Sequence, residues 1–452
     1  MVKKALLLNL FVSLIFCQLF AQKRIGDETA EQKETRMEWW KDSRFGMFIH
    51  WGLYSGAARH EWVKHNEHMN DEQYQKYFDQ FNPDLFDPVK WAKAAKAAGM
   101  KYAVLTTKHH EGFCLFDSKY TDYKATNTAA KRDLVREYVD AFRAEGLKVG
   151  FYYSLLDWHH PDYTMDEVHP LVQVDKSEEN YKRLNEGRDM AKYREYMRNQ
   201  ITELLTNYGK IDVLWLDWSW NKGAKRGKGA DDWGSVELLK LVRKLQPGII
   251  VNNRLGLYDY DDGGDFETPE QVGTDKLAAF KGKTWETCQT FSGSWGYYRD
   301  ENSWKTNRQL LDLLITSVSN GGNLILNVGP TARGEFDYRA TRALDNLGYW
   351  MHANSNSIYN CTYAPDIYKI PDGEKLTYNK ATGRLYIHLF NYPGNGKLTL
   401  PGYNGKIKYA QFLNDHSELL YKPSEADAND LVLTLPKKKP EYEIPVVELT
   451  LQ

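Results

Sequence analysis

The feature that narrows the choice of folds most is an alternation of short apolar segments with amphipathic segments between residue 40 and about residue 350. Such alternation is typical of parallel strands joined by helical crossovers. The predicted strands cover residues 45–49, 102–106, 149–153, 213–216, 249–252 and 324–328. The predicted helices cover residues 88–98, 132–144, 193–208 and 236–245, and the first three are followed by Gly99, Gly146 and Gly209, as helix C-termini favour.

These repeated units predict an α/β fold, a (β/α)8-like TIM barrel rather than an open sheet, because no glycine-rich dinucleotide-binding turn follows the first strand. Segments 159–187 and 221–233 have the composition of long loops over such a barrel. After Tyr359 the pattern changes to short alternating runs separated by turn dipeptides, which indicates an antiparallel β-sandwich. We therefore expect a barrel over residues 22–358 and a C-terminal β-sandwich over residues 359–452.

The first 21 residues have the pattern of a signal peptide. Lys3 and Lys4 precede an apolar run that ends near Ala21, where cleavage is expected. This predicts export to the periplasm or the extracellular space. A lipid anchor at Cys17 is the less favoured alternative, because Phe16 is bulky where such a motif needs a small residue. No later segment stays apolar over the roughly 18 residues that a membrane span needs, so no span is expected.

The charge balance and the cysteines argue against further classes of function. The 59 basic and 61 acidic residues nearly cancel and no basic stripe follows a helix, so nucleic acid is not an expected partner. Cys114, Cys288 and Cys361 lack the spacing of a zinc or redox motif, and we interpret them as buried apolar residues.

Polar side chains stand at the ends of five predicted strands. They are His50, the pair His109 and His110, Tyr152, Asp217 and Arg254. A TIM barrel places its active site at the C-terminal ends of its strands. One polar residue at a strand end is ordinary turn chemistry, but five on one rim indicate a polar pocket.

Asp217 ends the fourth predicted strand. The two-residue strand period places it on the same face as Val213 and Trp215. A carboxylate beside an indole is costly unless it is used or paired. A catalytic role is one interpretation, and capping of the following loop or pairing with Arg254 is the other.

Tryptophans gather near the predicted loops, where indole faces can stack on the apolar faces of sugar rings. They occupy positions 51, 62, 158, 215, 218, 220 and 295. The candidate carboxylates are Asp217, Glu267, Glu270 and Glu286. Together these residues point to glycoside hydrolysis, which needs one group to attack and another to protonate the leaving oxygen.

A metal site is the competing use of the rim histidines. His109 and His110 are adjacent, and neighbours on an extended chain point to opposite sides, so they do not suit one ion. No His-Glu-x-x-His helix supplements them. We therefore expect no catalytic metal.

Several longer stretches, in order from about residue 36 to residue 332, carry a family resemblance. They are RFGMFIHWG (44–52), HEW (60–62), KYAVLTTKHHEGF (101–113), GFYYS (150–154), LWLD (214–217), NNR (252–254), DFETPE (265–270), SWGY (294–297) and GGNLILNVGP (321–330). In these stretches the chain resembles the α-L-fucosidases of glycoside hydrolase family 29. They extend over essentially the whole predicted barrel.

The resemblance implies a retaining exo-α-L-fucosidase that removes terminal fucose from fucosylated oligosaccharides or glycoconjugates by double displacement, without cofactor or metal. It implies Asp217 as the nucleophile that forms a covalent fucosyl-enzyme. It assigns ring hydroxyls to Arg254 and the histidines, and the apolar side near the C6 methyl to Trp215 and Trp295. The implied substrate-binding residues are His50, Glu61, Trp62, His109, His110, Tyr152, Trp215, Arg254 and Trp295.

The identity of the acid/base stays open. Glu270 is favoured, because DFETPE is similar to the segment that supplies the acid in bacterial members of the family. Glu286 is the runner-up and Glu267 the third choice. A retaining pair lies roughly 5 to 5.5 Å apart, a distance that a sequence does not measure.

Two other functions remain as alternatives. A catalytically silent fucose-binding protein would keep the pocket without turnover, but Asp217 and a candidate acid are both present. A metal-dependent hydrolase on the same barrel would lose activity on chelation.

Overall fold

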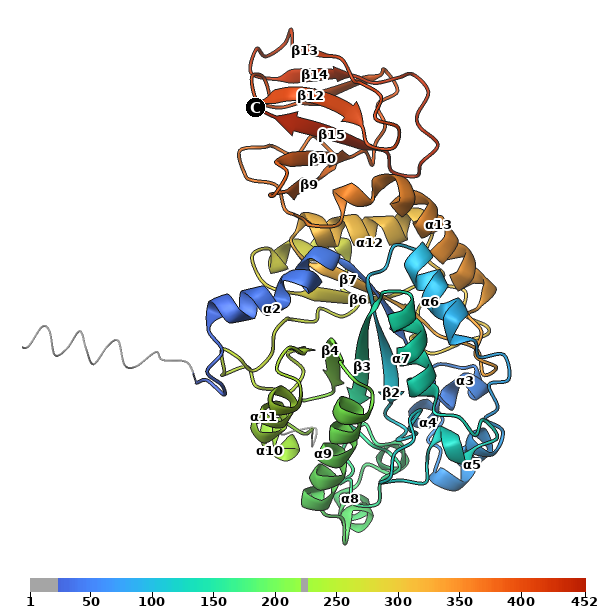
Figure 1. The fold of residues 1–452 in the computed structure, drawn as a ribbon. Helices are drawn as coiled ribbons and strands as arrows, with labels where there is room; N and C mark the ends of the chain where they lie inside the picture. Colours follow the sequence, from blue (N-terminus) through green and yellow to red (C-terminus); the bar gives the residue numbers. More distant parts are fainter. Residues whose placement is uncertain (1–22, 221–226) are drawn as a thin grey trace, which may run out of the picture.

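A computed structural model describes residues 23–220 and 227–452 (Figure 1). The expected signal peptide with Cys17 and residues 221–226 of the second expected loop lie outside these ranges. Within the described ranges, no helix has the length and apolar content that crossing a bilayer requires. Cys114, Cys288 and Cys361 are all free and buried, as predicted.

The larger domain is built on a curved parallel sheet whose helices cover its outer face (Figure 1). The strand order is β5-β4-β3-β2-β1-β7-β6. This confirms the predicted (β/α) barrel class. The strands are β1 (Phe45–Ile49), β2 (Tyr102–Lys108), β3 (Lys148–Ser154), β4 (Val213–Asp217), β5 (Ile250–Val251), β6 (Glu286–Thr290) and β7 (Asn323–Val328).

The helices agree with the predicted ones within a few residues, and Gly99, Gly146 and Gly209 adopt the left-handed conformation at their ends. The α-helices of this domain are α2 (Ala30–Ser43), α3 (Tyr54–Ala57), α4 (Val63–Asn66), α5 (Asp71–Asp79), α6 (Pro88–Ala97), α7 (Leu134–Ala144), α8 (Glu178–Asn185), α9 (Met190–Asn207), α10 (Ala230–Trp233), α11 (Ser235–Leu245), α12 (Asn307–Ser319) and α13 (Tyr338–Asn354). Short 3-10 helices are η1 (Ala125–Asn127), η2 (Pro170–Gln173), η4 (Thr274–Phe280) and η5 (Ser355–Ser357).

The expected loop over residues 159–187 is partly wrong, because it contains η2 and α8. Helix α8 begins after Ser177, whose side chain accepts a hydrogen bond from the Asn180 backbone N–H and so caps the helix. The expected loop over residues 221–233 likewise ends in the short helix α10.

An irregular segment closes the barrel between β5 and β6. Parallel bridges join Asn252 to Phe266, Glu267 to Trp285 and Glu270 to Cys288. The strand is irregular because Pro269 has no backbone N–H to donate. Residues 265–270 therefore take the place of an eighth strand, and this strand carries two of the candidate acids.

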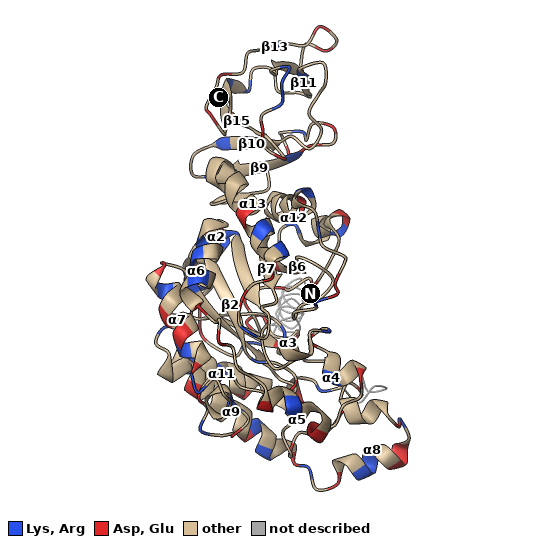
Figure 2. Cartoon of the chain, turned by 90° about the vertical axis from the view of Figure 1, so that its right-hand side faces the viewer, with Lys and Arg blue, Asp and Glu red and all other residues tan. Residues whose placement is uncertain are grey.

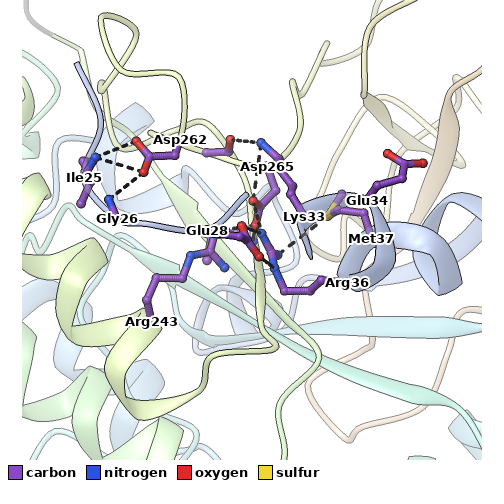
Figure 3. Close-up of polar contacts among 12 residues, drawn as sticks. Ile25, Gly26, Glu28, Lys33, Glu34, Arg36, Met37, Arg243, Asp262 and Asp265 are labelled. Atoms are coloured by element: carbon purple, nitrogen blue, oxygen red, sulfur yellow. Dashed lines mark hydrogen bonds and ion pairs between the residues drawn. The ribbon is translucent and has the colours of Figure 1, made fainter. Parts of the chain in front are cut away.

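A buried ion-pair network holds the start of this irregular strand (Figure 3). The Asp265 carboxylate accepts hydrogen bonds from Arg36 on α2 at 2.8 and 3.0 Å, and from Arg243 on α11 at 2.7 Å. It also accepts the backbone N–H of Val251 in β5 at 2.8 Å. Arg36 donates in addition to Glu28 at 2.6 Å. Two helices on the outside of the barrel thus fix the point where the eighth strand enters.

Alternate residues of the strands fill the barrel interior, as the two-residue period predicts. Val213 and Trp215 both point inward, and Asp217 follows them at the open end. They pack with Phe48, Tyr102, Val104, Tyr152, Ile250, Phe266, Cys288 and Ile325.

The C-terminal part forms two antiparallel sheets that enclose their own apolar core, which confirms the predicted β-sandwich. Their orders are β12-β15-β10-β9-β8 and β11-β14-β13. The domain stacks on α12 and α13 at one end of the barrel (Figure 1). Its strands are β8 (Cys361–Thr362), β9 (Lys375–Asn379), β10 (Arg384–His388), β11 (Lys397–Leu400), β12 (Ile407–Phe412), β13 (Tyr421–Pro423), β14 (Leu431–Thr434) and β15 (Val446–Leu451).

Charged residues lie on the outer helices, with acidic and basic positions interspersed along α7 and α8 (Figure 2). This arrangement agrees with the near balance of charge in the sequence. It gives a polyanion no continuous basic surface along these helices.

Candidate active site

Asp217 lies at the C-terminal end of β4, where one neutral and one charged donor hold its carboxylate. The Tyr152 hydroxyl donates to Oδ2 at 2.9 Å, and Arg254 Nη1 donates to Oδ1 at 2.8 Å. The pairing with Arg254 that the sequence left open as an alternative is therefore present. It does not remove Asp217 from the site, because Asp217 also lines the open cleft at the strand ends.

Arg254 connects Asp217 to the irregular eighth strand. Its Nη2 donates to Glu270 Oε2 at 2.7 Å, and its Nε donates to Thr268 Oγ1 at 2.8 Å. The guanidinium group also lies over the Trp215 ring, 4.6 Å from the ring centre. One arginine thus bridges Glu270 and Asp217. Its guanidinium contacts carboxylates here, whereas the resemblance assigned it to sugar hydroxyls.

The three rim histidines come together beside Tyr152. The ring centres of His109 and His110 are 4.0 Å apart, and those of His50 and His109 are 5.6 Å apart. Two of the rings are anchored through Nδ1: His50 contacts Asn327 Oδ1 at 2.6 Å and His110 contacts Ser154 Oγ at 2.7 Å. His109 Nδ1 lies 3.4 Å from Glu111 Oε2.

Glu61, Trp62 and Trp295 complete the wall around these histidines. Glu61 Oε2 accepts the backbone N–H groups of Trp295 and Gly296 at 3.1 and 2.8 Å. The Trp62 ring centre lies 5.3 Å from that of His110, and the Trp295 ring centre lies 5.1 Å from that of His50. All the substrate-binding residues named from the sequence therefore gather at one end of the barrel, with Trp215 buried beneath Arg254 as part of the floor.

Of the other two candidate acids, Glu267 lines the cleft together with Asp217, whereas Glu286 lies elsewhere. Glu286 starts β6 at the opposite, N-terminal end of the barrel, where it is buried and accepts a hydrogen bond from the Tyr102 hydroxyl. Burial raises the pKa of Glu286 to about 7, and the hydrogen bond from Tyr102 opposes the rise. Glu267 forms an ion pair with Lys283 at 3.1 Å. The contact with Arg254 distinguishes Glu270 from both.

Burial sets the protonation of the groups around Asp217. It raises the pKa of Tyr152 well above 10, and the Asp217 charge adds to the rise, so the hydroxyl keeps its proton and donates. Burial lowers the pKa of His50 and His110 well below 6.5, and His109 lowers both further, so these rings are neutral. Burial would lower the pKa of Arg254, but the Asp217 and Glu270 carboxylates raise it above its usual value.

A cleft of about 620 Å³ extends from Asp217 away from the histidines. Its walls include Trp218, Trp220, Tyr258 and Phe280. Trp218 follows Asp217 with a backbone φ of 78°, a left-handed conformation that is unusual for a bulky residue. This turn places its indole 5.1 Å from that of Trp62.

The sequence did not identify the residues that anchor the histidines. Asn327 lies inside the apolar strand β7, and its polar side chain in a buried strand is the signal that would have marked it. Ser154 and Glu111 lie within stretches that carry the family resemblance, but their contacts are formed only by folding. In the described ranges, no group of three or more His, Cys, Asp or Glu residues is arranged to hold a metal ion.

Comparison with known proteins identifies the family of the chain. The profile of the alpha-L-fucosidase family matches residues 14–356. Alpha-L-fucosidase isoenzyme 1 from Paenibacillus thiaminolyticus is similar in structure, with a TM-score of 0.84, 44% sequence identity, and coverage of 93% of this chain and 99% of that chain. Human plasma alpha-L-fucosidase is 31% identical over 412 residues, which cover 83% of this chain and 80% of that protein.

A third relative, an alpha-L-fucosidase of family GH29 from Bacteroides thetaiotaomicron, has been solved as a trapped covalent intermediate in complex with 2-fluoro-fucosyl fluoride. It has a TM-score of 0.79 and 30% identity, and the match covers 92% of this chain and 96% of that chain. The family profile extends over the whole barrel that carries the site, and the solved relatives match the barrel and the β-sandwich together. The chain belongs to the alpha-L-fucosidase family.

Proposed function

We propose that the protein is a retaining exo-α-L-fucosidase that hydrolyses terminal α-linked L-fucose from glycans. The observation that carries this proposal is the arrangement of Asp217 and Glu270 on the two terminal nitrogens of Arg254 at the open end of the barrel. A retaining glycosidase needs two carboxyl groups about 5 to 5.5 Å apart on either side of one glycosidic bond. The trapped covalent intermediate of the Bacteroides thetaiotaomicron relative supports a double displacement.

In the first step, an oxygen of Asp217 attacks C1 of fucose. The bond from C1 to the glycosidic oxygen breaks, and that oxygen takes a proton from Glu270. The Asp217 charge is consumed as the ester forms, and Glu270 becomes a carboxylate. Glu270 pairs with Arg254 in the structure, so this contact must give way when the protonated Glu270 meets the glycosidic oxygen.

In the second step, the Glu270 carboxylate takes a proton from water, and the water oxygen bonds to C1. The bond from C1 to Asp217 breaks, so the carboxylate reforms and fucose leaves with its original anomeric configuration. The Tyr152 hydroxyl and Arg254 both donate to Asp217, and both favour the return of its negative charge.

The two ends of the site fit the two parts of the substrate. The histidines, Glu61 and Trp62 offer polar atoms for the ring hydroxyls, and Trp295 over Phe48 offers an apolar surface for the C6 methyl. The cleft of about 620 Å³ beyond Asp217 has room for the sugar from which fucose is released, with Tyr258 exposed at its edge.

The nucleophile is tested with Asp217→Ala. Turnover of p-nitrophenyl α-L-fucoside should be lost, and added azide should restore part of it by attacking C1 from the emptied side. The product should then be the inverted fucosyl azide, identified by NMR. Near-normal hydrolysis by the variant would rule out this role for Asp217. A wild-type protein that binds fucose without any turnover would instead support the silent binding protein.

The acid/base is tested by comparing Glu270→Ala with Glu286→Ala on two substrates. Loss of Glu270 should slow a substrate with a poor leaving group severely and p-nitrophenyl fucoside only mildly, because only the poor leaving group needs protonation. Glu286→Ala should change folding stability without this dependence on the leaving group, since Glu286 lies at the other end of the barrel. The opposite pattern would exchange the two assignments.

We also propose that the protein is exported after removal of residues 1–21. The support is the charged start and apolar run of the N-terminal sequence. N-terminal sequencing of the mature protein should begin at Gln22. A mature chain that begins with a lipid-modified Cys17 would contradict cleavage after Ala21 and would indicate that a lipid anchors the protein to a membrane.

A further inference from the structure

We propose that His50 and His110 of the pocket both present hydrogen-bond acceptors, so that the site selects sugars whose hydroxyl groups act as donors. Asn327 and Ser154 are the positioning residues that impose this role. The inference rests on the proposed function. It adds which property of the sugar hydroxyl groups these histidines recognise, namely their ability to donate a hydrogen bond.

The polarity of His50 follows from the contacts of Asn327. The Asn327 side chain donates through Nδ2 to the Trp295 carbonyl oxygen at 2.6 Å. A carbonyl oxygen only accepts, so the NH2 group must lie on that side and Oδ1 must face the histidine. His50 Nδ1, 2.6 Å from Oδ1, must then carry the proton. The neutral ring is left with an unprotonated Nε2.

The same reasoning applies to His110. The Ser154 hydroxyl donates to the Leu156 carbonyl oxygen at 3.0 Å, which uses its one proton. Its oxygen can then only accept from His110 Nδ1 at 2.7 Å. Nε2 of His110 is therefore also unprotonated.

His109 is not fixed in the same way. Its Nδ1 lies 3.4 Å from Glu111 Oε2 but makes no hydrogen bond to the described residues, and neither oxygen of the buried Glu111 carboxylate accepts one from them. Within the described part of the chain, neighbouring groups therefore fix the proton position of His50 and His110 but not that of His109.

No hydrogen bond from the described residues reaches Nε2 of His50 or His110, because each of these two rings makes its hydrogen bond through Nδ1. Burial keeps His50 and His110 neutral by lowering the pKa of both well below 6.5. A third acceptor is nearby: Glu61 Oε1 takes no hydrogen bond from the described residues, whereas Oε2 takes two from backbone N–H groups. His60 Nδ1, 3.3 Å from Oε1, accepts from the Trp62 N–H and so has no proton to give.

A pocket with this excess of acceptors needs a ligand that donates. A sugar hydroxyl both donates and accepts, so it satisfies an unprotonated Nε2 through its proton. Fluorine is close to a hydroxyl group in size but has no proton, and it would meet the lone pair of Nε2 with its own. Replacing a hydroxyl group that contacts a histidine by fluorine should therefore weaken binding at least as much as removing it.

The first test measures the tautomers directly. Long-range 1H–15N correlation spectra of the full-length protein labelled with [15N]histidine distinguish protonated Nδ1 from protonated Nε2. His50 and His110 should be neutral with the proton on Nδ1, and Ser154→Ala should change the signals of His110 alone. A proton on Nε2 of either ring would overturn the proposal. Because this test needs no sugar, it is independent of the proposed function.

The second test uses L-fucose and its deoxy and deoxyfluoro analogues at C2, C3 and C4 as inhibitors of p-nitrophenyl fucoside hydrolysis. Each replacement of a hydroxyl group read by a histidine should raise the inhibition constant about five- to tenfold, the effect of one lost hydrogen bond. The fluoro analogue should bind no better than the deoxy analogue. Tighter binding of the fluoro analogues would show that the histidines donate. Failure of L-fucose itself to inhibit or bind would instead count against the proposed function.

Ser154→Ala connects the two tests. The substitution removes the partner of His110 Nδ1, so the ring can carry its proton on Nε2 instead. At one position of the sugar ring, the inhibition constant of the deoxyfluoro analogue should then fall relative to that of the deoxy analogue. Ser154→Thr keeps the hydroxyl group and should restore the wild-type ratio of the two inhibition constants. Ser317→Ala is the matched control, because Ser317 is also buried and donates to a backbone carbonyl, that of Leu313, but lies on α12. An identical analogue profile in Ser154→Ala and wild type would refute the role of Ser154.

Discussion

At the scale of single residues, the two donors on Asp217 differ in what they contribute. Arg254 brings a positive charge that also meets Glu270, so its removal would disturb both carboxylates at once. Tyr152 is neutral and contacts Asp217 through one hydroxyl group at 2.9 Å. It is therefore the residue whose removal isolates the effect of a single hydrogen bond on Asp217, the proposed nucleophile.

Tyr152→Phe should lower kcat by about ten- to a hundredfold. The Asp217 carboxylate regains its charge when its bond to C1 breaks, and a hydrogen bond to a charged group is worth about 1.5 to 3 kcal/mol. The later, deglycosylation step should become slower, so a burst of p-nitrophenol is expected in stopped-flow traces. Tyr138→Phe is the control, because Tyr138 is equally buried but donates to the carbonyl oxygens of Ala103 and Gly150. That variant should lose stability and keep kcat. Equal kcat values for Tyr152→Phe and wild type would contradict the role given to Tyr152.

At the scale of elements, the irregular eighth strand carries Glu270, the proposed acid/base. Its entry is fixed by Asp265, which lies between Arg36 on α2 and Arg243 on α11 (Figure 3). Burial would raise the pKa of Asp265, but the two arginines outweigh it and lower the pKa to about 2. The pKa of Asp265 is thus lower in the folded state than its ordinary value near 3.8. The ion pairs of Asp265 with the two arginines therefore stabilise the fold at pH values above this ordinary pKa, and the stabilisation is lost as the pH falls toward 2.

Asp265→Asn should destabilise the protein by about 3 to 5 kcal/mol at neutral pH, because it leaves two arginines beside an uncharged side chain. The difference from wild type in urea denaturation should shrink as the pH falls from about 4 to about 2. Asp262→Asn is the control from the same segment, since Asp262 accepts only the backbone N–H groups of Ile25 and Gly26 in this network. A constant difference over the acid range would mean that the charge of Asp265 is not the source of the stability.

The same strand shows where prediction from sequence reaches its limit. The apolar strands and the glycine-terminated helices follow from periodicity, and so does the inward face of Val213 and Trp215. Strand β6, with the sequence ETCQT, is buried along its whole length and yet polar, so no apolar pattern marks it. Segment 265–270 pairs through single bridges around Pro269, which no strand periodicity describes.

The candidate site divides in the same way. Residues at strand ends were predictable, because the barrel topology brings the ends of all strands to one rim. The resemblance favoured Glu270 over Glu286, but the strand pattern alone did not separate them, because the end of the barrel that each side chain reaches is set by the fold. The anchors Ser154 and Asn327 were missed for a related reason, since their contacts cross from one strand to another.

At the scale of the whole molecule, the barrel and the β-sandwich share an apolar interface. Ile444 and Val446 of the sandwich belong to the same continuous core as Leu347 and Trp350 of α13. The Trp350 indole N–H donates to the Ile444 carbonyl oxygen at 2.8 Å. A continuous core favours cooperative unfolding of the two domains.

Trp350→Ala tests this coupling, because it removes a large side chain that is almost completely buried where the two domains meet. The cavity and the lost hydrogen bond should cost about 3 to 5 kcal/mol, nearly all of it at the interface. Calorimetry should therefore show one unfolding transition for the wild type and two for the variant. Fucosidase activity of the variant should be lost over the temperature range in which the barrel unfolds. Tyr338→Ala is the control on the same helix, since Tyr338 is 77% exposed, and its transition should match that of wild type. One unsplit transition in Trp350→Ala, at the wild-type temperature, would mean that the shared core does not couple the domains, and that the barrel holds its active site without support from the sandwich.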